Sequence, residues 1–584
     1  MCGIIGYTGG RSARGIIYGG LKKLEYRGYD SAGIATLDGR NISVVKRQGK
    51  VGELEGLLDA LSGSTGIGHT RWATHGKPSD INAHPHLSGK FAVVHNGIIE
   101  NFNELKDEYF KDDYFRSQTD SEIVAKLLDK FYGGNILDAV FKVANLLKGS
   151  YALLIICTDF DGLIAVKYKS PVILGFGEGE NFVASDLPAL SGVCREFSVM
   201  DDNDVAVVTK KEVKIYDGAK QYKRLKKMRN SALCEDTGLK GYPYYMIKEI
   251  SENPATVKKT ITSFFRVERK LKEEFEGVDR IIIIGCGTAY NSGLVAKRYI
   301  ENFARICTEV ETAGEFRYKN PVLTNGTAVI AVSQSGETAD TVEASKAVKE
   351  RGVKLIAVTN SPHSALSRIA DAVVPVSAGA EICVAATKSY IGQVVALYLT
   401  AKLIAGDSGV KYLLPYIRLC EDTLALRGID ALADMCKCAS GVYFLGRDID
   451  YAVAVEASLK LKEITYIPSE GYPAGELKHG TLALIDESKV AVFIITDENL
   501  AVKSENAVDQ VLSRRGKVAI ITSLKDVETR WKDKAPVLKI PDCDGLLSPL
   551  LSATAVQRLA YVTAIKMGRN PDRPRNLAKS VTVE

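Results

Sequence analysis

The sequence predicts a multidomain α/β protein, with a mixed N-terminal domain followed by two tandem, doubly wound domains. Its 584 residues exceed the roughly 250–300 residues over which a single hydrophobic core grows. Short apolar runs such as residues 91–94 and 152–156 indicate strands with interleaved helices in the first part. In the second part, the apolar segment of residues 280–285 recurs as residues 441–446.

This internal repeat is the strongest indication of fold in the second half. Two further strand-like segments recur in the same order, and the number of residues between the two copies is nearly constant. The paired segments are residues 329–333 with 492–496, and 351–359 with 515–522. Strands that alternate with helices predict parallel sheets covered on both faces. Turn-rich residues 238–243 precede a helical pattern, and we expect the first domain boundary there.

Composition excludes several classes of protein. Hydrophobic residues make up 46% and charged residues 25%, which is ordinary for a globular chain, and the net charge of +5 does not indicate a nucleic-acid partner. We find no apolar run of about 18 residues and no signal-peptide pattern, so no membrane partner is expected. Eleven scattered cysteines suit a reducing compartment, which predicts a cytoplasmic protein.

The second residue is a cysteine. We expect removal of Met1, because small residues follow it, and Cys2 would then carry both a thiol and a free α-amine. An α-amine titrates at about 7.7–8.0 and a thiol near 8.5, so the amine can accept the thiol proton directly or through water. The thiolate could then attack a carbonyl carbon, as in amide hydrolysis. A cysteine at this position by chance is the alternative.

Residues 333–338 (SQSGET) follow a strand-like segment and open a helix. Hydroxyls and backbone N–H groups at a helix N-terminus bind anions, and the glycine permits close approach. No lysine follows the glycine, which excludes a nucleotide P-loop. We expect a phosphate here, with simple helix capping as the alternative. The repeat copy at residues 496–501 has two acids and no glycine, so only the first copy should bind phosphate.

Glu456, Lys460 and Glu463 lie at helical spacing along one face. An exposed row of ion pairs is one interpretation. Much of this helix is apolar, however, so the charges could instead face a cleft. His479 lies in a loop rich in glycine and proline, where acid–base work is a candidate role.

Taken together, the motifs carry a resemblance that covers essentially the whole chain. They are residues 2–4, 24–31, 69–76, 95–98, 117–122, 333–338, 475–480 and 574–584. In this order they resemble the glutamine–fructose-6-phosphate aminotransferases, also called glucosamine-6-phosphate synthases, of the bacterial type. The resemblance implies conversion of D-fructose 6-phosphate and L-glutamine to D-glucosamine 6-phosphate and L-glutamate, with ammonia channelled between two sites.

The resemblance also implies a domain plan. The first domain should be a glutaminase with the N-terminal-nucleophile αββα fold of class II glutamine amidotransferases, and two sugar isomerase (SIS) domains should follow. The expected segments are 2–239 (glutaminase), 240–415 (linker helix and first SIS domain), 416–565 (second SIS domain) and 566–584 (active-site tail).

By this resemblance, Cys2 attacks the side-chain amide of glutamine. Asn96 and the N–H of Gly97 form the oxyanion hole, which stabilises charge as it develops. Arg71 binds the α-carboxylate and Asp120 the α-ammonium group, one charge of each sign for a zwitterion. The implied glutamine-binding residues are Arg71, Trp72, Thr74, His75, Gly97 and Asp120.

In the isomerase half, the resemblance makes Lys579 the lysine that forms an imine with the open-chain ketone. Glu463 moves a proton between C1 and C2 with Lys460 close by, and His479 helps to open the sugar ring. The implied sugar-phosphate residues are Thr288, Ser333, Gln334, Ser335, Thr338, Val384 and Ala578. A homodimer is also implied, with His479 placed in the active site of the partner chain.

Five of the seven histidines lie between residues 69 and 95. No spacing there fits a known metal site, so we expect a polar scaffold around the glutamine pocket, with no metal and no flavin, nicotinamide or pyridoxal cofactor. The resemblance implies that Trp72 gates a dry passage for ammonia, which is nucleophilic only when unprotonated.

Two positions depart from the family pattern. Ala289 and Ala386 stand where the family usually has serine, and each lost hydroxyl could cost roughly 0.5–1.5 kcal/mol of substrate binding. A second interpretation therefore keeps the glutaminase but changes the acceptor to another sugar phosphate. A third is a binding protein that senses sugar phosphates, although the catalytic candidates and the lack of a DNA-binding segment argue against it.

Overall fold

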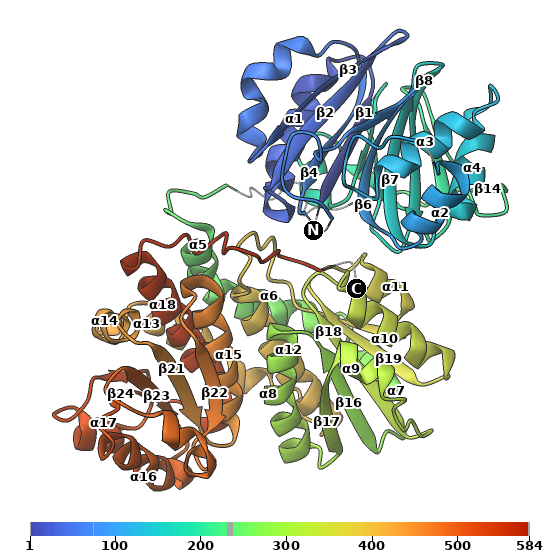
Figure 1. The fold of residues 1–584 in the computed structure, drawn as a ribbon. Coiled ribbons are helices and arrows are strands. Elements are labelled where there is room, and N and C mark those ends of the chain that lie inside the picture. Colours follow the sequence, from blue (N-terminus) through green and yellow to red (C-terminus); the bar gives the residue numbers. More distant parts are fainter. Residues whose placement is uncertain (1, 74, 112, 230–237, 582–584) are drawn as a thin grey trace. The chain divides into compact units, whose positions relative to one another are not determined.

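The computed structural model describes residues 2–73, 75–111, 113–229 and 238–581 (Figure 1). The chain divides into two compact units: residues 1–236 with 580–584, and residues 237–579. Thr74, one of the predicted glutamine-binding residues, lies outside the described residues, as does Met1.

In the first unit, two antiparallel sheets face each other and helices cover their outer faces (Figure 1). The eight-stranded sheet has the order β15-β11-β9-β10-β1-β4-β2-β3. Its strands are β1 (Gly3–Thr8), β2 (Ser31–Asp38), β3 (Asn41–Gln48), β4 (Thr65–Arg71), β9 (Ile173–Phe176), β10 (Asn181–Ala184), β11 (Glu196–Val199) and β15 (Met228–Arg229). Helix α1 (Ala13–Leu24) packs against β1 and β4.

The seven-stranded sheet has the order β14-β13-β12-β8-β7-β6-β5. Its strands are β5 (His86–Ser88), β6 (Phe91–Ile99), β7 (Gly149–Cys157), β8 (Phe160–Tyr168), β12 (Asp204–Val208), β13 (Val213–Tyr216) and β14 (Tyr222–Lys223). The remaining helices of this unit are α2 (Phe102–Tyr109), α3 (Glu122–Phe131) and α4 (Ile136–Leu146). Helix α3 lies against β5 and β6, which completes an αββα arrangement and confirms the predicted fold class.

Side chains along each strand point alternately to its two faces, and this explains why the strands are unbroken apolar runs in the sequence. On β1, Ile4 points into the core between the sheets, whereas Ile5 points towards α1. On β7, Leu154 lies in the core between the sheets and Leu153 packs with α3 and α4. Because both faces of each strand are covered, apolar residues are favoured at every position.

The second unit contains two five-stranded parallel sheets, with the orders β17-β16-β18-β19-β20 and β22-β21-β23-β24-β25. The first consists of β16 (Arg280–Gly285), β17 (Cys307–Thr312), β18 (Thr327–Ser333), β19 (Lys354–Thr359) and β20 (Ala372–Pro375). The second consists of β21 (Gly441–Gly446), β22 (Ser469–Pro473), β23 (Lys489–Ile495), β24 (Lys517–Thr522) and β25 (Val537–Lys539). The identical order confirms the internal repeat, and in such sheets ligands bind where the strand order reverses.

The repeat extends to single backbone angles. Gly287 follows β16 with φ 55° and ψ −125°, and Asp448 follows β21 with φ 52° and ψ −121°. Glycine adopts a positive φ at little cost, whereas aspartate does so under strain. Two turns with the same unusual geometry place Ala289 and Asp450 at equivalent positions in the two domains.

Helices cover both sheets of the second unit. They are α5 (Tyr245–Ser251), α6 (Asn253–Phe264), α7 (Glu268–Glu274), α8 (Thr288–Phe303), α9 (Ala313–Tyr318), α10 (Ala339–Glu350), α11 (Ala365–Ile369), α12 (Lys388–Ile404), α13 (Val410–Leu424), α14 (Ile429–Lys437), α15 (Ile449–Thr465), α16 (Ala501–Leu512), α17 (Lys525–Trp531) and α18 (Pro549–Lys566). Helices α8 and α15 pack against each other, which joins the two doubly wound domains. That packing brings side chains of α15 to the carboxyl end of the first sheet.

The predicted domain boundaries at residues 239, 415 and 565 stay predictions; helix α13 runs across residue 415. Across the described ranges, no helix has both the length and the apolar character needed to cross a bilayer.

Candidate active sites

Cys2 immediately precedes β1, and its thiol lies against the end of β4. The Trp72 N–H donates to Cys2 Sγ at 3.3 Å, and Sγ lies 3.5 Å from the Trp72 carbonyl oxygen. Burial raises the pKa of the Cys2 thiol, while the Trp72 N–H and the charges of Arg71 and Arg27 oppose that rise. The thiol therefore needs a base to become a nucleophile at neutral pH.

Asn96, one of the two residues expected to form the oxyanion hole, contacts the backbone of Cys2. Asn96 Nδ2 donates to the Cys2 carbonyl oxygen at 3.0 Å from strand β6. Gly97 has φ +133°, and a Cβ there would lie 1.9 Å from the Ser150 carbonyl oxygen, so only glycine fits. The Asn96 amide thus lies against the backbone of Cys2, and Gly97 follows it on β6.

Arg27 also reaches this site, although sequence analysis gave it no role. Its Nε donates to the Cys2 carbonyl oxygen at 3.1 Å, and its guanidinium pairs with Asp186 at 2.8 Å. The only signal in the sequence was its place inside the motif of residues 24–31. A buried arginine that binds the chain next to a nucleophile fixes the backbone there.

Arg71 is buried and its guanidinium donates to the carbonyl oxygens of His75 and Gly76, the latter at 3.1 Å. Asp120 accepts the Ile99 N–H at 2.7 Å, and its charge acts on Arg71. The two predicted partners of a zwitterion thus belong to one site. His75 itself is exposed.

The other four histidines of the cluster are buried. His69 Nε2 lies 2.9 Å from the His95 carbonyl oxygen, and its ring centroid lies 4.0 Å from that of His84. His86 contacts Thr119 at 3.0 Å. Burial lowers the pKa of all four rings, that of His69 to about 3, so they are neutral. Among the described residues, no group of three or more histidine, cysteine, aspartate or glutamate side chains is arranged to hold a metal ion.

A cavity of about 170 Å³ lies in the second unit at the carboxyl end of the first parallel sheet. Ten of the eleven predicted isomerase residues line it; His479 does not, and is exposed. The lining residues are Cys286, Thr288, Ala289, Val332, Ser333, Gln334, Ser335, Thr338, Val384, Ala386, Gln393, Lys460, Glu463, Leu577, Ala578 and Lys579. Both alanines that depart from the family pattern are in this wall.

The loop between β18 and α10 forms one side of the cavity. Ser333 Oγ lies 3.1 Å from Thr338 Oγ1 and accepts the Gly336 N–H at 3.0 Å. Ser335 Oγ accepts the Glu337 N–H at 3.1 Å. Thr338 is the N-cap residue of α10, but its side chain makes no capping hydrogen bond. Its hydroxyl is therefore directed to the loop, which favours anion binding over simple capping.

Helix α15 supplies charged groups from the opposite side, and they are not an exposed row. Lys460 is 1% exposed and pairs with Glu463 at 2.7 Å, while its Nζ donates to Thr288 Oγ1 at 3.0 Å. Glu463 Oε2 has no hydrogen-bond partner among the described residues, so its contact with Lys460 is an ion pair without hydrogen-bond geometry.

Glu456 is fully buried and accepts Asn291 Nδ2 at 2.7 Å. Burial raises its pKa to about 7, against the opposing charge of Lys460.

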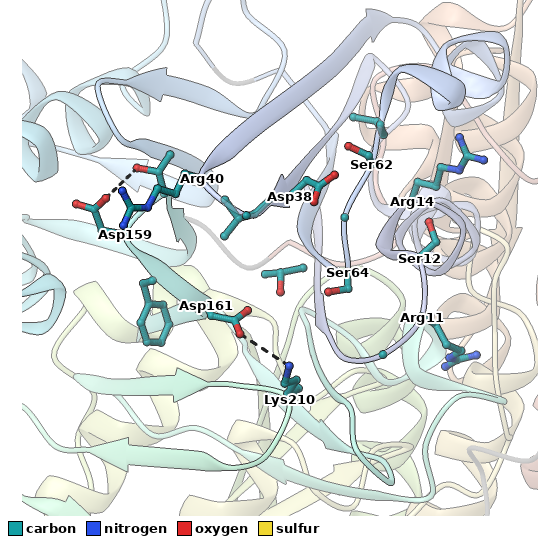
Figure 2. A pocket seen from close by; sticks show the side chains of 18 of the residues that line it. Arg11, Ser12, Arg14, Asp38, Arg40, Ser62, Ser64, Asp159, Asp161 and Lys210 are labelled. Carbon is teal, nitrogen blue, oxygen red and sulfur yellow. Dashed lines mark hydrogen bonds and ion pairs between the residues drawn. The ribbon is translucent and has the colours of Figure 1, made fainter.

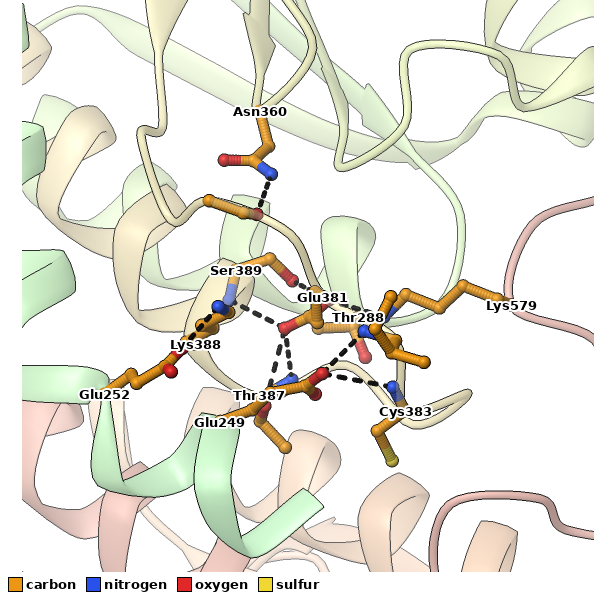
Figure 3. Close-up of polar contacts among 12 residues, drawn as sticks. Glu249, Glu252, Thr288, Asn360, Glu381, Cys383, Thr387, Lys388, Ser389 and Lys579 are labelled. Atoms are coloured by element: carbon orange, nitrogen blue, oxygen red, sulfur yellow. Dashed lines mark hydrogen bonds and ion pairs between the residues drawn. The ribbon is translucent and has the colours of Figure 1, made fainter. Parts of the chain in front are cut away.

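Lys579 enters the cavity from the C-terminal tail and pairs with Glu381 at 2.5 Å (Figure 3). Glu381 also accepts hydrogen bonds from the N–H groups of Thr387 and Ser389, both at 3.0 Å. Burial alone would raise the pKa of Glu381, but Lys579 and these N–H donors lower it to about 2. Glu381 was not among the predicted site residues, because an isolated acid in a loop carries no periodic signal.

The equivalent place in the second doubly wound domain is closed. Thr496, which follows β23 as Ser333 ends β18, donates its N–H and its hydroxyl to the Asp450 carboxyl at 2.8 and 2.5 Å. Asp450 stands where the first domain has Ala289. The chain's own carboxyl group thus occupies the donors of the second copy, while phosphate binding by the first copy stays a prediction.

A further cavity of about 1120 Å³ lies in the first unit (Figure 2). None of the predicted site residues lines it. Three of its basic residues are paired with acids: Arg11 with Glu180 at 2.8 Å, Arg14 with Asp59 at 2.9 Å and Lys210 with Asp161 at 4.0 Å.

Comparison with known proteins identifies the family. A protein from Caldanaerobacter subterraneus named glutamine–fructose-6-phosphate aminotransferase [isomerizing] is 44% identical over 100% of both chains, and one of the same name from Clostridium perfringens is 42% identical over 100% of both. This chain belongs to the glutamine–fructose-6-phosphate aminotransferase family.

Other matches of this family member agree with its two units. The model of the glutamine amidotransferase domain matches residues 69–192, and that of the SIS domain matches residues 274–403 and 435–563. The solved C-terminal domain of glucosamine-fructose-6-phosphate aminotransferase from Francisella tularensis covers 58% of this chain and 100% of that chain, with 35% identity and a TM-score of 0.54.

Proposed function

We propose that this enzyme converts D-fructose 6-phosphate and L-glutamine to D-glucosamine 6-phosphate and L-glutamate. The observation that carries the proposal is the cavity of about 170 Å³, in which an amine, a carboxylate and a loop of hydroxyls converge. Lys579, Glu463 and the loop of residues 333–338 together suit a phosphorylated ketose. The names of the relatives, and the amidotransferase domain in the same chain, support the same reaction.

In the first half-reaction, Cys2 Sγ attacks the side-chain amide carbon of glutamine and ammonia leaves. The free α-amine of processed Cys2 takes the thiol proton, which burial otherwise holds on the sulfur. Asn96 Nδ2 and the Gly97 N–H stabilise the developing oxyanion, while Arg71 and Asp120 orient the substrate. Water then releases glutamate from the thioester. Arg71 would exchange its loop carbonyls for the substrate carboxylate, a stronger, charge-assisted partner.

In the second half-reaction, the loop of residues 333–338 binds the phosphate. Lys579 forms an imine with the C2 ketone, and ammonia from the first site replaces the lysine. Glu463 then carries a proton between C1 and C2, which converts the ketose derivative into an aldose. Lys460, which also contacts Thr288 and the buried Glu456, holds Glu463 in place.

We propose that the enzyme works as a homodimer in the cytoplasm. His479 is the one predicted isomerase residue that does not line the cavity of its own chain, and it is exposed on a 3₁₀-helix (Leu477–His479). A partner chain could use it to open the sugar ring. All ten cysteines of the described residues are free thiols, which supports a reducing compartment.

The second candidate, another sugar phosphate as acceptor, rests on Ala289 and Ala386 in the cavity wall. Both candidates are tested by product identification with glutamine and each of several ketose phosphates, with wild-type enzyme and the Cys2→Ala variant. Glucosamine 6-phosphate formed only by the wild type supports the proposal. Negligible turnover of fructose 6-phosphate beside turnover of another ketose phosphate would replace it with the second candidate.

A further inference from the structure

A second buried acid, Glu249 of helix α5, lies close to the Lys579–Glu381 pair (Figure 3). Its Oε1 accepts the N–H groups of Ile382 and Cys383 at 2.5 and 3.2 Å. These are the two residues that follow Glu381. Its Oε2 is buried and has no hydrogen-bond partner among the described residues. Burying a carboxylate whose second oxygen accepts no hydrogen bond is unfavourable in free energy, whereas a protonated carboxyl group needs fewer hydrogen-bond donors around it.

The charges around Glu249 also favour its protonated form. Lys579 and Glu381 are 6% and 0% exposed, so they form a buried pair that is neutral overall. Lys388, which also faces Glu249, pairs with Glu252 at 2.5 Å, and Glu252 also meets Lys248 at 3.6 Å. Asp572, which accepts the N–H groups of Tyr245 and Met246 at the start of α5, and Cys383 are the other titratable groups beside this cluster. An ionised Glu249 would place a second negative charge close to Glu381 in a buried, low-dielectric region. Burial and the charge of Glu381 raise the pKa of Glu249 to about 8, although Lys579 and the two N–H groups oppose them.

We propose that Glu249 is a positioning residue that acts in its protonated form: it holds the backbone at residues 382–383 and leaves Glu381 as the single anion beside Lys579. This inference rests on the proposed function, in which Lys579 must attack a ketone. A second carboxylate would stabilise the ammonium form of the lysine and so oppose that attack.

The chemical step balances within the cluster. The Lys579 ammonium group gives a proton to the Glu381 carboxylate, and the nitrogen lone pair forms a bond to C2 while the C=O π electrons move to oxygen. That oxygen takes the proton from Glu381, and after a second proton passes from nitrogen to the hydroxyl group, water leaves. The products are the iminium ion, the Glu381 carboxylate and one water. Neutral Glu249 keeps the total charge of the three protein groups at zero before the step and when the lysine is deprotonated.

Reductive trapping tests the inference without glutamine or ammonia. Enzyme and fructose 6-phosphate are treated with cyanoborohydride between pH 6.5 and 9.5, and the modified Lys579 peptide is quantified by mass spectrometry. The measured quantity is the trapping rate of each variant divided by that of the wild type at the same pH. Glu249→Gln keeps the acceptor oxygen and cannot ionise. Glu249→Ala loses the backbone contacts, and Asp450→Asn, a buried acid in the other doubly wound domain, is the matched control.

We expect the ratio for Glu249→Gln to be near one at pH 7 and to rise to about tenfold at pH 9, following a pKa of about 8 in the wild type. The ratio for Asp450→Asn should stay flat, and that for Glu249→Ala should be low at every pH. A flat ratio for Glu249→Gln, or a loss at pH 7 as large as that of Glu249→Ala, overturns the inference. Absence of any wild-type adduct at Lys579 would instead overturn the proposed function.

Discussion

Gly336 is the residue on which the geometry of the proposed phosphate loop depends. It has φ +64°, and a Cβ added there would lie 2.0 Å from Ser364 Oγ and 2.5 Å from Ser364 Cβ. Ser364 cannot rotate away, because the clash includes its Cβ, and it caps helix α11. Since Cβ atoms keep at least 3.0 Å from such neighbours, Gly336→Ala must displace the loop by about 1 Å.

That displacement should cost binding of the sugar phosphate. The hydrogen bond from the Gly336 N–H to Ser333 Oγ is 3.0 Å long, and a shift of about 1 Å takes it beyond bonding range. A loop displaced in this way should in turn lose one of its own hydrogen bonds to the charged phosphate, which costs about 1.5–3 kcal/mol, or about 10- to 150-fold in affinity. We therefore expect the KM for fructose 6-phosphate to rise by that factor, while glutamine hydrolysis stays unchanged.

Gly352→Ala is the matched control. Gly352 has φ +71° in the same domain, but a Cβ there meets nothing within 4 Å. Both substitutions pay the cost of a left-handed alanine, about 1–2 kcal/mol, which urea unfolding measures. Only Gly336→Ala should change the KM for fructose 6-phosphate. A folded Gly336→Ala enzyme with wild-type KM, or an equal rise for Gly352→Ala, would refute the reasoning.

Three further predictions follow from other contacts. Cys2→Ala should abolish synthesis with glutamine but not with high ammonium, and retained glutamine-dependent synthesis would remove Cys2 as nucleophile. Lys460→Met leaves Glu456 buried without its cation and should lower the free energy of unfolding by about 3–5 kcal/mol relative to the exposed Lys462→Met, whereas equal urea midpoints would contradict the buried pair. Burial raises the pKa of Asp450 from 3.8 to about 7, so its carboxyl group favours the folded state below pH 4 and loses that contribution as the pH rises to 7. The wild type should therefore lose up to about 4 kcal/mol of unfolding free energy over this range that Asp450→Asn retains; parallel pH profiles for the two proteins would be the contrary result.

The fold class and the repeat could be predicted because each depends on local pattern. Residues 281–284 and 442–445 are apolar at every position, as the centres of strands covered on both faces must be, and they lie in β16 and β21. The helix that carries Glu456, Lys460 and Glu463 was also predictable, but whether its charged face is exposed or buried was not. Spacing alone allowed an exposed row of ion pairs, and only the packing of α15 against α8 buries Lys460 and turns it to Thr288.

The sequence by itself determined what depends on neighbours along the chain: the thiol next to the N-terminus and the hydroxyl loop after β18. Tertiary structure alone decided which distant groups share a cavity and which charges survive burial. Glu249, Glu381 and Lys579 are separated by more than a hundred residues at each step, and no periodicity links them. Their protonation follows from low dielectric and mutual charge, which arise only when the chain has folded around them.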